Sequence, residues 1–228
     1  MAVGAIHTYI KEILQIERDP ETIRFYRGQA SLQWELQPTI FREANENILK
    51  HEQRLLKELQ VIYPDSFSDC LNSFEVMVKA QHYDIPTRLL DITSNPLVAL
   101  YFACEETDKK GNAIVYIFDI PKEKILFYDN DEMLNNIESL LDKETCQIQC
   151  HCVRARLNNP RIIRQSGAFL LYGNVTDNTI LNEKRIEIVR NRIKSIKEDL
   201  MLLNISNATL FPELPSYAKD LKNGLINI

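Results

Sequence analysis

The sequence predicts a single α+β domain, in which a central mixed or antiparallel sheet is flanked by several helices. Two observations support this fold class. Amphipathic helical stretches alternate with β-rich apolar runs along all 228 residues, and no repeat, low-complexity tract or linker-like stretch divides them. The composition, with 45% hydrophobic and 26% charged residues, is that of an ordinary globular domain.

Three helices are predicted in the first part of the chain. The first has an apolar stripe near the helical period, and the second has apolar residues and a charged outer face. They cover residues 1–18, 43–62 and about 69–81. Asp19 and Pro20 end the first helix, because a proline disfavours helical backbone in the residue before it.

A strand is predicted over residues 22–27. Side chains alternate between the two faces of a strand, so Arg27 shares the inward face of Ile23 and Phe25. An ordinary surface arginine does not occupy such a position. Gly28 follows and permits a sharp exit or a close backbone approach.

A buried helix and a central strand are predicted next. Asn95 is a good helix cap and Pro96 a good first helical residue. Residues 97–104 are apolar on almost every side, so we expect this helix to be buried. The continuous β-rich run over residues 113–120 predicts a strand in the middle of the sheet.

The remaining elements are predicted from weaker patterns. Residues 121–160 indicate one or two short helices and a strand near residues 146–153, and residues 168–172 indicate another strand. Apolar residues at steps of three and four predict one core-facing amphipathic helix over residues 183–203. A final helix is expected to end near residue 221.

The charge and the chain start limit the possible classes of function. The net charge of −5 gives no electrostatic footprint for non-specific nucleic-acid binding. No apolar run approaches the roughly 20 residues that cross a bilayer. The first residues lack the pattern of a secretory signal. We therefore expect a cytoplasmic protein that does not enter a membrane.

The five cysteines favour reduced thiols over a disulfide framework, since their number is odd and no secretion signal precedes them. Cys146, Cys150, His151 and Cys152 lie close together. Their spacing is not a standard zinc-binding spacing, whereas Cys150 and Cys152 alternate as strand residues do. A strand is the preferred interpretation, and no metal site is predicted.

Polar side chains among strongly apolar neighbours mark two segments, residues 25–29 and 81–96. Arg27 in the first segment has the planar fork that binds a phosphate or carboxylate group of a ligand. The alternative is an ion pair between Arg27 and Asp91 that ties the two segments together. Arg88 lies among large apolar residues and must pair with a carboxylate or a ligand.

The end of the second segment has the chemistry of an anion site. Asp91, Thr93 and Ser94 lie just before the predicted helix start, where free amides and the helix dipole favour negative charge. Simple capping by Ser94 or Asn95 is the alternative.

Two further residues are candidates for hydrogen bonding or proton transfer. His82 has an ordinary pKa near neutrality, so it is either a general acid or base or a structural residue. Gln165 is a neutral hydrogen-bonding residue at another strand edge. The signature motifs of ordinary kinases, dehydrogenases, serine hydrolases and zinc proteases are absent from the sequence.

At these residues the chain resembles the FRG domain family, named for a Phe-x-Arg-Gly-type motif near its start. Asp84 stands where a glycine is usual in this family, and Ile92 where an aromatic residue is usual. The resemblance implies one FRG-like domain over residues 1–228, with its motifs between about residues 20 and 221. The matching features are residues 25–29, Trp34, Leu36, Pro38, Arg42 and residues 80–93, 95–103, 165–169 and 210–214.

A second resemblance is to the ADP-ribosyltransferases. In their first motif, an arginine or histidine at a strand end holds the phosphates or ribose of NAD, and Arg27 is similar. Residues 91–94 and the following helix resemble their Ser-Thr-Ser motif, which supports the nicotinamide pocket. Gln165 stands nearest to the position of their catalytic glutamate, and its neutral amide lacks the electrostatic stabilisation that a carboxylate supplies.

These resemblances imply an ADP-ribosyltransferase-like fold and NAD as substrate. The first hypothesis is ADP-ribosyl transfer to a nucleic-acid or protein target in bacterial defence or a toxin system. The second is a catalytically silent module that binds a nucleotide or a protein, and the third is a purely structural ion network of Arg27, Arg88 and Asp91. The predicted ligand-binding residues are Arg27, Gly28, Gln29, Arg88, Thr93 and Ser94, and the predicted catalytic residues are His82, Asp91 and Gln165.

Overall fold

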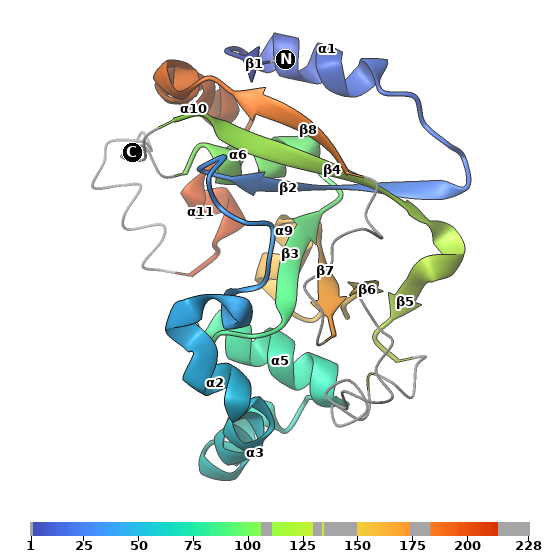
Figure 1. Ribbon diagram of the computed structural model, residues 1–228, viewed down its shortest axis with the longest axis vertical. Helices are drawn as coiled ribbons and strands as arrows, with labels where there is room; N and C mark the ends of the chain where they lie inside the picture. The colour runs from blue at the N-terminus through green and yellow to red at the C-terminus, as the bar shows by residue number, and fades with distance from the viewer. Residues whose placement is uncertain (1, 106–110, 130–133, 135–149, 174–182, 214–228) are drawn as a thin grey trace.

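A mixed sheet organises the residues that the computed structural model describes, which are 2–105, 111–129, 134, 150–173 and 183–213 (Figure 1). Its eight strands have the order β1-β8-β4-β2-β3-β7-β6-β5. The pairs β1–β8 and β5–β6 are parallel, and the other neighbours are antiparallel. The strands are β1 (Ala2–Val3), β2 (Thr22–Gln29), β3 (Leu89–Thr93), β4 (Ala113–Pro121), β5 (Ile125–Phe127), β6 (Cys150–Arg154), β7 (Gly167–Tyr172) and β8 (Glu183–Ile188).

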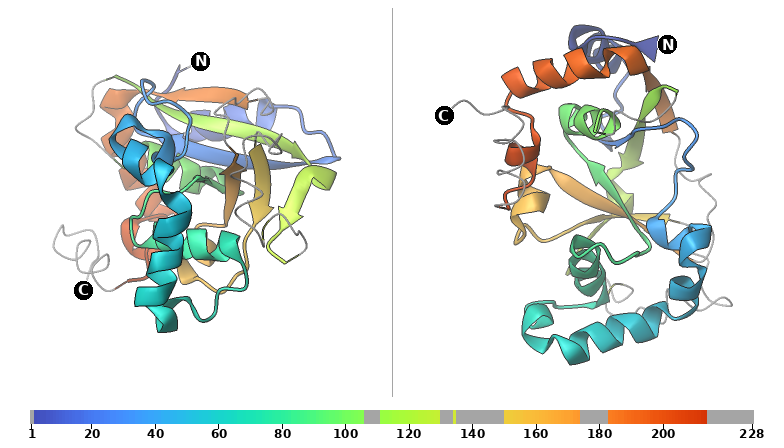
Figure 2. Two further views of the ribbon diagram at one scale, coloured as in Figure 1. Left: turned by 60° about the horizontal axis from the view of Figure 1, so that its bottom comes forward. Right: turned by 90° about the vertical axis from the view of Figure 1, so that its left-hand side faces the viewer.

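Helices cover the two halves of this sheet separately. Helices α1, α6 and α10 pack in one apolar core with β2, β4 and β8. Helices α3 and α5 pack in another core with β3, β6 and β7, at the opposite end of the molecule (Figures 1 and 2). The helices of the described residues are α1 (Ile6–Gln15), α2 (Glu46–Lys50), α3 (Glu52–Ile62), α4 (Pro64–Phe67), α5 (Ser73–His82), α6 (Pro96–Ala103), α9 (Pro160–Arg164), α10 (Ile193–Leu202) and α11 (Asn207–Leu210).

The sheet is nearly divided between β2 and β3. Strand β2 pairs with β4 along its whole length, and β3 pairs with β7 along its whole length. Between β2 and β3, the one register pair is Tyr26 with Thr93. The two halves of the sheet run in visibly different directions from this point (Figure 1). The separation leaves room for side chains from both halves to meet in a cleft.

Gly28 brings helix α6 directly onto strand β2. A Cβ atom at Gly28 would lie 1.9 Å from the carbonyl oxygen of Ala99 and 2.5 Å from the amide nitrogen of Ala103. Only glycine permits this backbone contact. The predicted close backbone approach is therefore made to a helix of the same chain.

We expect Gly28→Ala to destabilise the protein by about 3 kcal/mol, because the new methyl group has to push helix α6 away from β2. Gly167→Ala is the matched control on β7, since a Cβ atom there meets its nearest neighbour at 3.6 Å. Equilibrium unfolding in urea measures both variants. Equal stability of the two variants would contradict the close packing of α6.

Most predicted elements in the described residues are confirmed. The strands expected over residues 22–27, 113–120 and 168–172 are β2, β4 and β7, and the expected mixed sheet is present. The side chain of Asn95 caps α6, accepting the amide of Leu97 at 2.9 Å. Strand β6 contains Cys150 and Cys152, both buried, whereas Cys146 lies outside the described residues.

The helix predicted over residues 183–203 is wrong in its first part. Residues 183–188 form strand β8, and α10 begins only at Ile193. Ile186 and Ile188 are both buried at a spacing of two, and β8 pairs antiparallel with β4. The three-residue step from Ile186 to Val189 imitates a helical stripe, but the long-range pairing decides the structure.

The structure describes only part of the region of the last predicted helix. Helix α11 ends at Leu210, and residues 214–221 of the prediction lie outside the described residues. Among the helices that the structure describes, none has the length and apolar character that crossing a bilayer requires.

Candidate functional site

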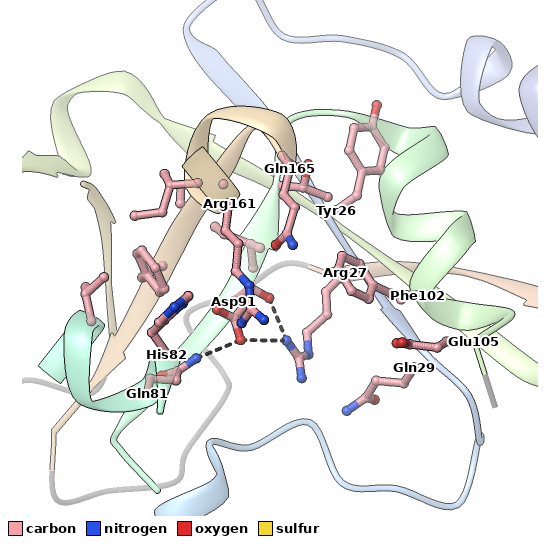
Figure 3. Close-up of a pocket in the computed structure, with 18 of the residues that line it drawn as sticks. Tyr26, Arg27, Gln29, Gln81, His82, Asp91, Phe102, Glu105, Arg161 and Gln165 are labelled. Carbon is pink, nitrogen blue, oxygen red and sulfur yellow. Dashed lines mark hydrogen bonds and ion pairs between the residues drawn. The ribbon is translucent and has the colours of Figure 1, made fainter. Parts of the chain in front are cut away.

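A cleft of about 390 Å³ opens where β2 and β3 separate (Figure 3). Residues of β2, α5, β3, α6, α9 and β7 line it, together with Phe211 after α11 and residues of the connecting loops. Ser94 and Arg88 of the predicted site do not line this cleft. The predicted residues that do are Arg27, Gly28, Gln29, His82, Asp91, Thr93 and Gln165.

Arg27 extends from β2 toward β3 across the separation. Its Nη1 donates a 2.6 Å hydrogen bond to the carbonyl oxygen of Asp91 and lies 4.0 Å from the Asp91 carboxylate. Its Nε is buried and has no hydrogen-bond partner among the described residues. Burial lowers the pKa of Arg27, but an arginine stays charged in a protein. The guanidinium therefore keeps donor capacity for a ligand.

The carboxylate of Asp91 lies beside Arg27 and is open to the cleft, with 62% of the side chain exposed. The Gln81 amide donates to Asp91 Oδ2 at 2.8 Å, and Thr87 in turn donates to the Gln81 oxygen. The partial loss of hydration between the cleft walls raises the pKa of Asp91, and the charge of Arg27 opposes that rise. Asp91 is thus a positioned carboxylate with one oxygen available to a ligand.

His82 ends helix α5 at the side of the cleft. Burial and then the positive charge of Arg161 lower its pKa, which favours the neutral imidazole. Its Nε2 lies 3.9 Å from the carboxylate of Glu213. A neutral imidazole at this place can accept a proton.

Thr93 and Gln165 hold the cleft wall together. Thr93 donates a 2.6 Å hydrogen bond to the carbonyl oxygen of Gln165 and accepts the amide of Asn95. The Gln165 side chain donates to the carbonyl oxygen of Leu210 at 3.1 Å. Both side chains therefore join chain segments at the cleft, and Ser94 lies exposed beside Ser166.

Arg88 corrects the prediction of one shared ion network. It is fully buried and pairs with Glu52, a residue of α3, and it also donates to the carbonyl oxygens of Tyr172 and Gly173. These contacts satisfy the hydrogen-bond donors of the Arg88 guanidinium, and they lie outside the cleft. Arg88 is therefore a structural residue here, and the network of Arg27, Arg88 and Asp91 is not formed.

The structure adds Arg161 to the predicted cleft residues. Its guanidinium pairs with Glu213 at 2.7 Å and lies over the ring of Phe211 at 4.9 Å. Arg161 was missed in the sequence analysis because the bounds of the short helix α9 were not predicted. The Asn159-Pro160 pair carried the signal, since it starts α9 with the same Asn-Pro cap that starts α6. Other lining residues outside the predicted set include Trp34, Phe102 and Glu105.

The comparison with protein families finds a match in the part of the chain that supplies several of the cleft residues. The FRG domain family matches residues 23–112. The chain contains an FRG domain. The match includes α5, β3 and all of β2 but its first residue, and these elements supply Arg27, His82 and Asp91 to the cleft. No curated protein and no solved structure matches the chain.

The match does not cover the residues after 112. Gln165 and Phe211 lie beyond the part matched by the FRG domain family, so the extension of this domain to residue 221 stays a prediction. Asp84, where the resemblance to the FRG domain family leads us to expect a glycine, has a φ of 61°. This left-handed conformation explains why glycine suits the position.

Proposed function

We propose that the cleft of the FRG domain binds NAD. The observation that carries this proposal is the Arg27 guanidinium, which lies at the division of the sheet with an unpaired, buried Nε. A planar guanidinium recognises phosphate oxygens well, and the cleft volume lies in the usual range for small-molecule sites. Trp34, Phe102 and Phe211 add aromatic surface on which a nucleotide ring can pack.

The reaction that we propose is ADP-ribosyl transfer. The bond between C1′ of the ribose and the nicotinamide nitrogen breaks, and nicotinamide leaves with the electron pair. The resulting oxocarbenium-like centre needs a nearby negative charge. Asp91 supplies that charge in this proposal, since Gln165 is neutral and its amide is bound to Leu210. An acceptor nucleophile then forms the new bond to C1′ and gives up its proton, which His82 accepts in this proposal.

A protein is the favoured acceptor. A second cavity of about 450 Å³ adjoins the cleft and shares His82 with it. Its cations are already neutralised, Lys79 by Asp69 at 2.6 Å and Arg156 by Glu75 at 2.9 Å. A phosphate backbone would have to displace these carboxylates. The bacterial defence or toxin setting and a cytoplasmic location stay predictions.

A silent nucleotide-binding module is the second candidate. The feature that favours it is Gln165, which stands nearest to the position of the glutamate in the ADP-ribosyltransferases. In this case NAD binds with the same dependence on Arg27, and no nicotinamide is released.

Two measurements on the intact chain test these functions. Calorimetry with NAD should show saturable binding, and a timed assay should detect free nicotinamide. Binding without nicotinamide release would favour the silent module. The absence of both NAD binding and a NAD-induced rise in melting temperature would overturn the proposal.

We expect Asp91→Asn to reduce nicotinamide release about 100- to 1000-fold, because it removes the charge that stabilises the transition state. Its melting temperature should stay close to that of the wild type, since 62% of the Asp91 side chain is exposed. Asp84→Asn, at another carboxylate of the cleft, is the matched control. Wild-type nicotinamide release by Asp91→Asn would exclude the role given to this residue.

A further inference from the structure

The cleft contains two arginines besides Arg27, namely Arg42 and Arg161, and the NAD-binding proposal has used neither. Arg161 comes from α9, on a different wall from Arg27, and both side chains extend toward Asp91 (Figure 3). The side chain of Arg161 is 32% exposed. Its charge also acts on the cleft, since it contributes to lowering the pKa of His82.

In this structure the guanidinium of Arg161 is paired with a carboxylate of the same chain, that of Glu213. Glu213 Oε1 lies 2.7 Å from Arg161 Nε, and Phe211 packs under the guanidinium. The other carboxylate oxygen of Glu213, Oε2, is buried without a hydrogen-bond partner among the described residues. An imperfectly satisfied carboxylate is easier to displace than a fully bonded one. A ligand anion that binds Arg161 better can therefore take its place.

The segment that carries Glu213 has its own attachments to α9. Arg164 donates to the carbonyl oxygen of Thr209 at 3.3 Å, and Gln165 donates to that of Leu210 at 3.1 Å. These bonds do not involve the guanidinium of Arg161. Glu213 can therefore leave Arg161 while the preceding residues stay attached to the cleft wall.

We infer that Arg161 is a phosphate-binding residue of the nucleotide site: it binds one phosphate of a diphosphate whose other phosphate contacts Arg27. Glu213 pairs with Arg161 when no ligand is bound. This inference rests on the proposed binding of NAD. It adds the selection of a diphosphate over a single phosphate, because two separated guanidinium groups match two phosphates.

Calorimetry with three probes on the intact chain tests the inference: NAD, inorganic pyrophosphate and inorganic phosphate. Arg161→Gln should weaken NAD and pyrophosphate about 10- to 100-fold, as expected for the loss of one charge-assisted contact, and should change phosphate much less. Glu213→Gln should strengthen NAD and pyrophosphate roughly fivefold, since a partly exposed ion pair no longer competes.

Arg164→Gln is the matched control, because Arg164 lies on the same helix and contacts the same segment but does not line the cleft. It should bind all three probes as the wild type does. In the double variant with both Arg161→Gln and Glu213→Gln, the gain from Glu213→Gln should disappear, because Glu213 acts through Arg161. Arg161→Lys keeps the positive charge and should therefore recover part of the affinity that Arg161→Gln loses. Such a recovery would show that the site tolerates substitution.

The outcomes separate this inference from the proposed function. If NAD binds and depends on Arg27, but Arg161→Gln and Glu213→Gln bind NAD as Arg164→Gln does, the role of Arg161 is overturned and NAD binding stands. The same holds if Glu213→Gln strengthens binding equally with and without Arg161. If the wild type does not bind NAD, the proposed function itself fails, whether or not pyrophosphate binds.

Discussion

Arg27→Ala is expected to abolish NAD binding while the protein stays folded. The guanidinium makes one hydrogen bond to the Asp91 carbonyl oxygen, its Nε has no hydrogen-bond partner among the described residues, and Arg27 lines the cleft. Loss of two charge-assisted contacts to phosphate would weaken NAD at least about 100-fold. The fold loses little, because the removed bond is worth about 1 kcal/mol and an incompletely paired buried charge disappears with it.

Arg24→Ala is the control on the same strand. Arg24 is buried, and Asp119 accepts two of its hydrogen bonds, at 2.6 and 2.8 Å. Its removal should lower stability and leave the NAD affinity of the folded protein unchanged. Calorimetry gives the affinities, and thermal melting with and without NAD gives the stabilities. Unfolding of Arg27→Ala under conditions in which Arg24→Ala stays folded would mean that Arg27 has a structural role.

Local sequence patterns predicted the cleft residues where a single element determined their position. Alternation along β2 placed Arg27 on the face of Phe25, and Arg27 lines the cleft, although the opposite face with Arg24 and Tyr26 is buried as well. The Asn95-Pro96 pair was enough to start α6 and to place Asp91 and Thr93 just before it. In both cases the deciding interactions lie within a few residues of the chain.

The same patterns failed where a distant partner decides the structure. Arg88 lies among apolar residues as Arg27 does, but its carboxylate partner is Glu52, which lies 36 residues earlier. The hydrogen bond from Gln165 to Leu210 spans 45 residues. Neither hydrophobic periodicity nor a helix cap indicates such a long-range contact. Sequence analysis could therefore predict that Arg88 needs a partner, but not which residue that partner is.

The buried pair of Glu52 and Arg88 gives the largest expected effect on stability. We expect Glu52→Ala to lower the free energy of unfolding by about 3–5 kcal/mol, because it leaves the guanidinium of Arg88 buried without its counter-charge. Glu58→Ala is the matched control on the same helix. Glu58 pairs with Arg54 at 3.9 Å, and both side chains are exposed, so its loss should cost about 0–1 kcal/mol.

Equilibrium unfolding in urea, followed by circular dichroism, measures these free energies. The double substitution Glu52→Leu with Arg88→Met removes both charges and should recover part of the loss, as apolar replacements of buried ion pairs do. Recovery should be incomplete, because the carbonyl oxygens of Tyr172 and Gly173 lose their donor. A folded double variant should bind NAD as the wild type does, since Arg88 does not line the cleft. Loss of NAD binding in that folded variant would return Arg88 to the ligand site.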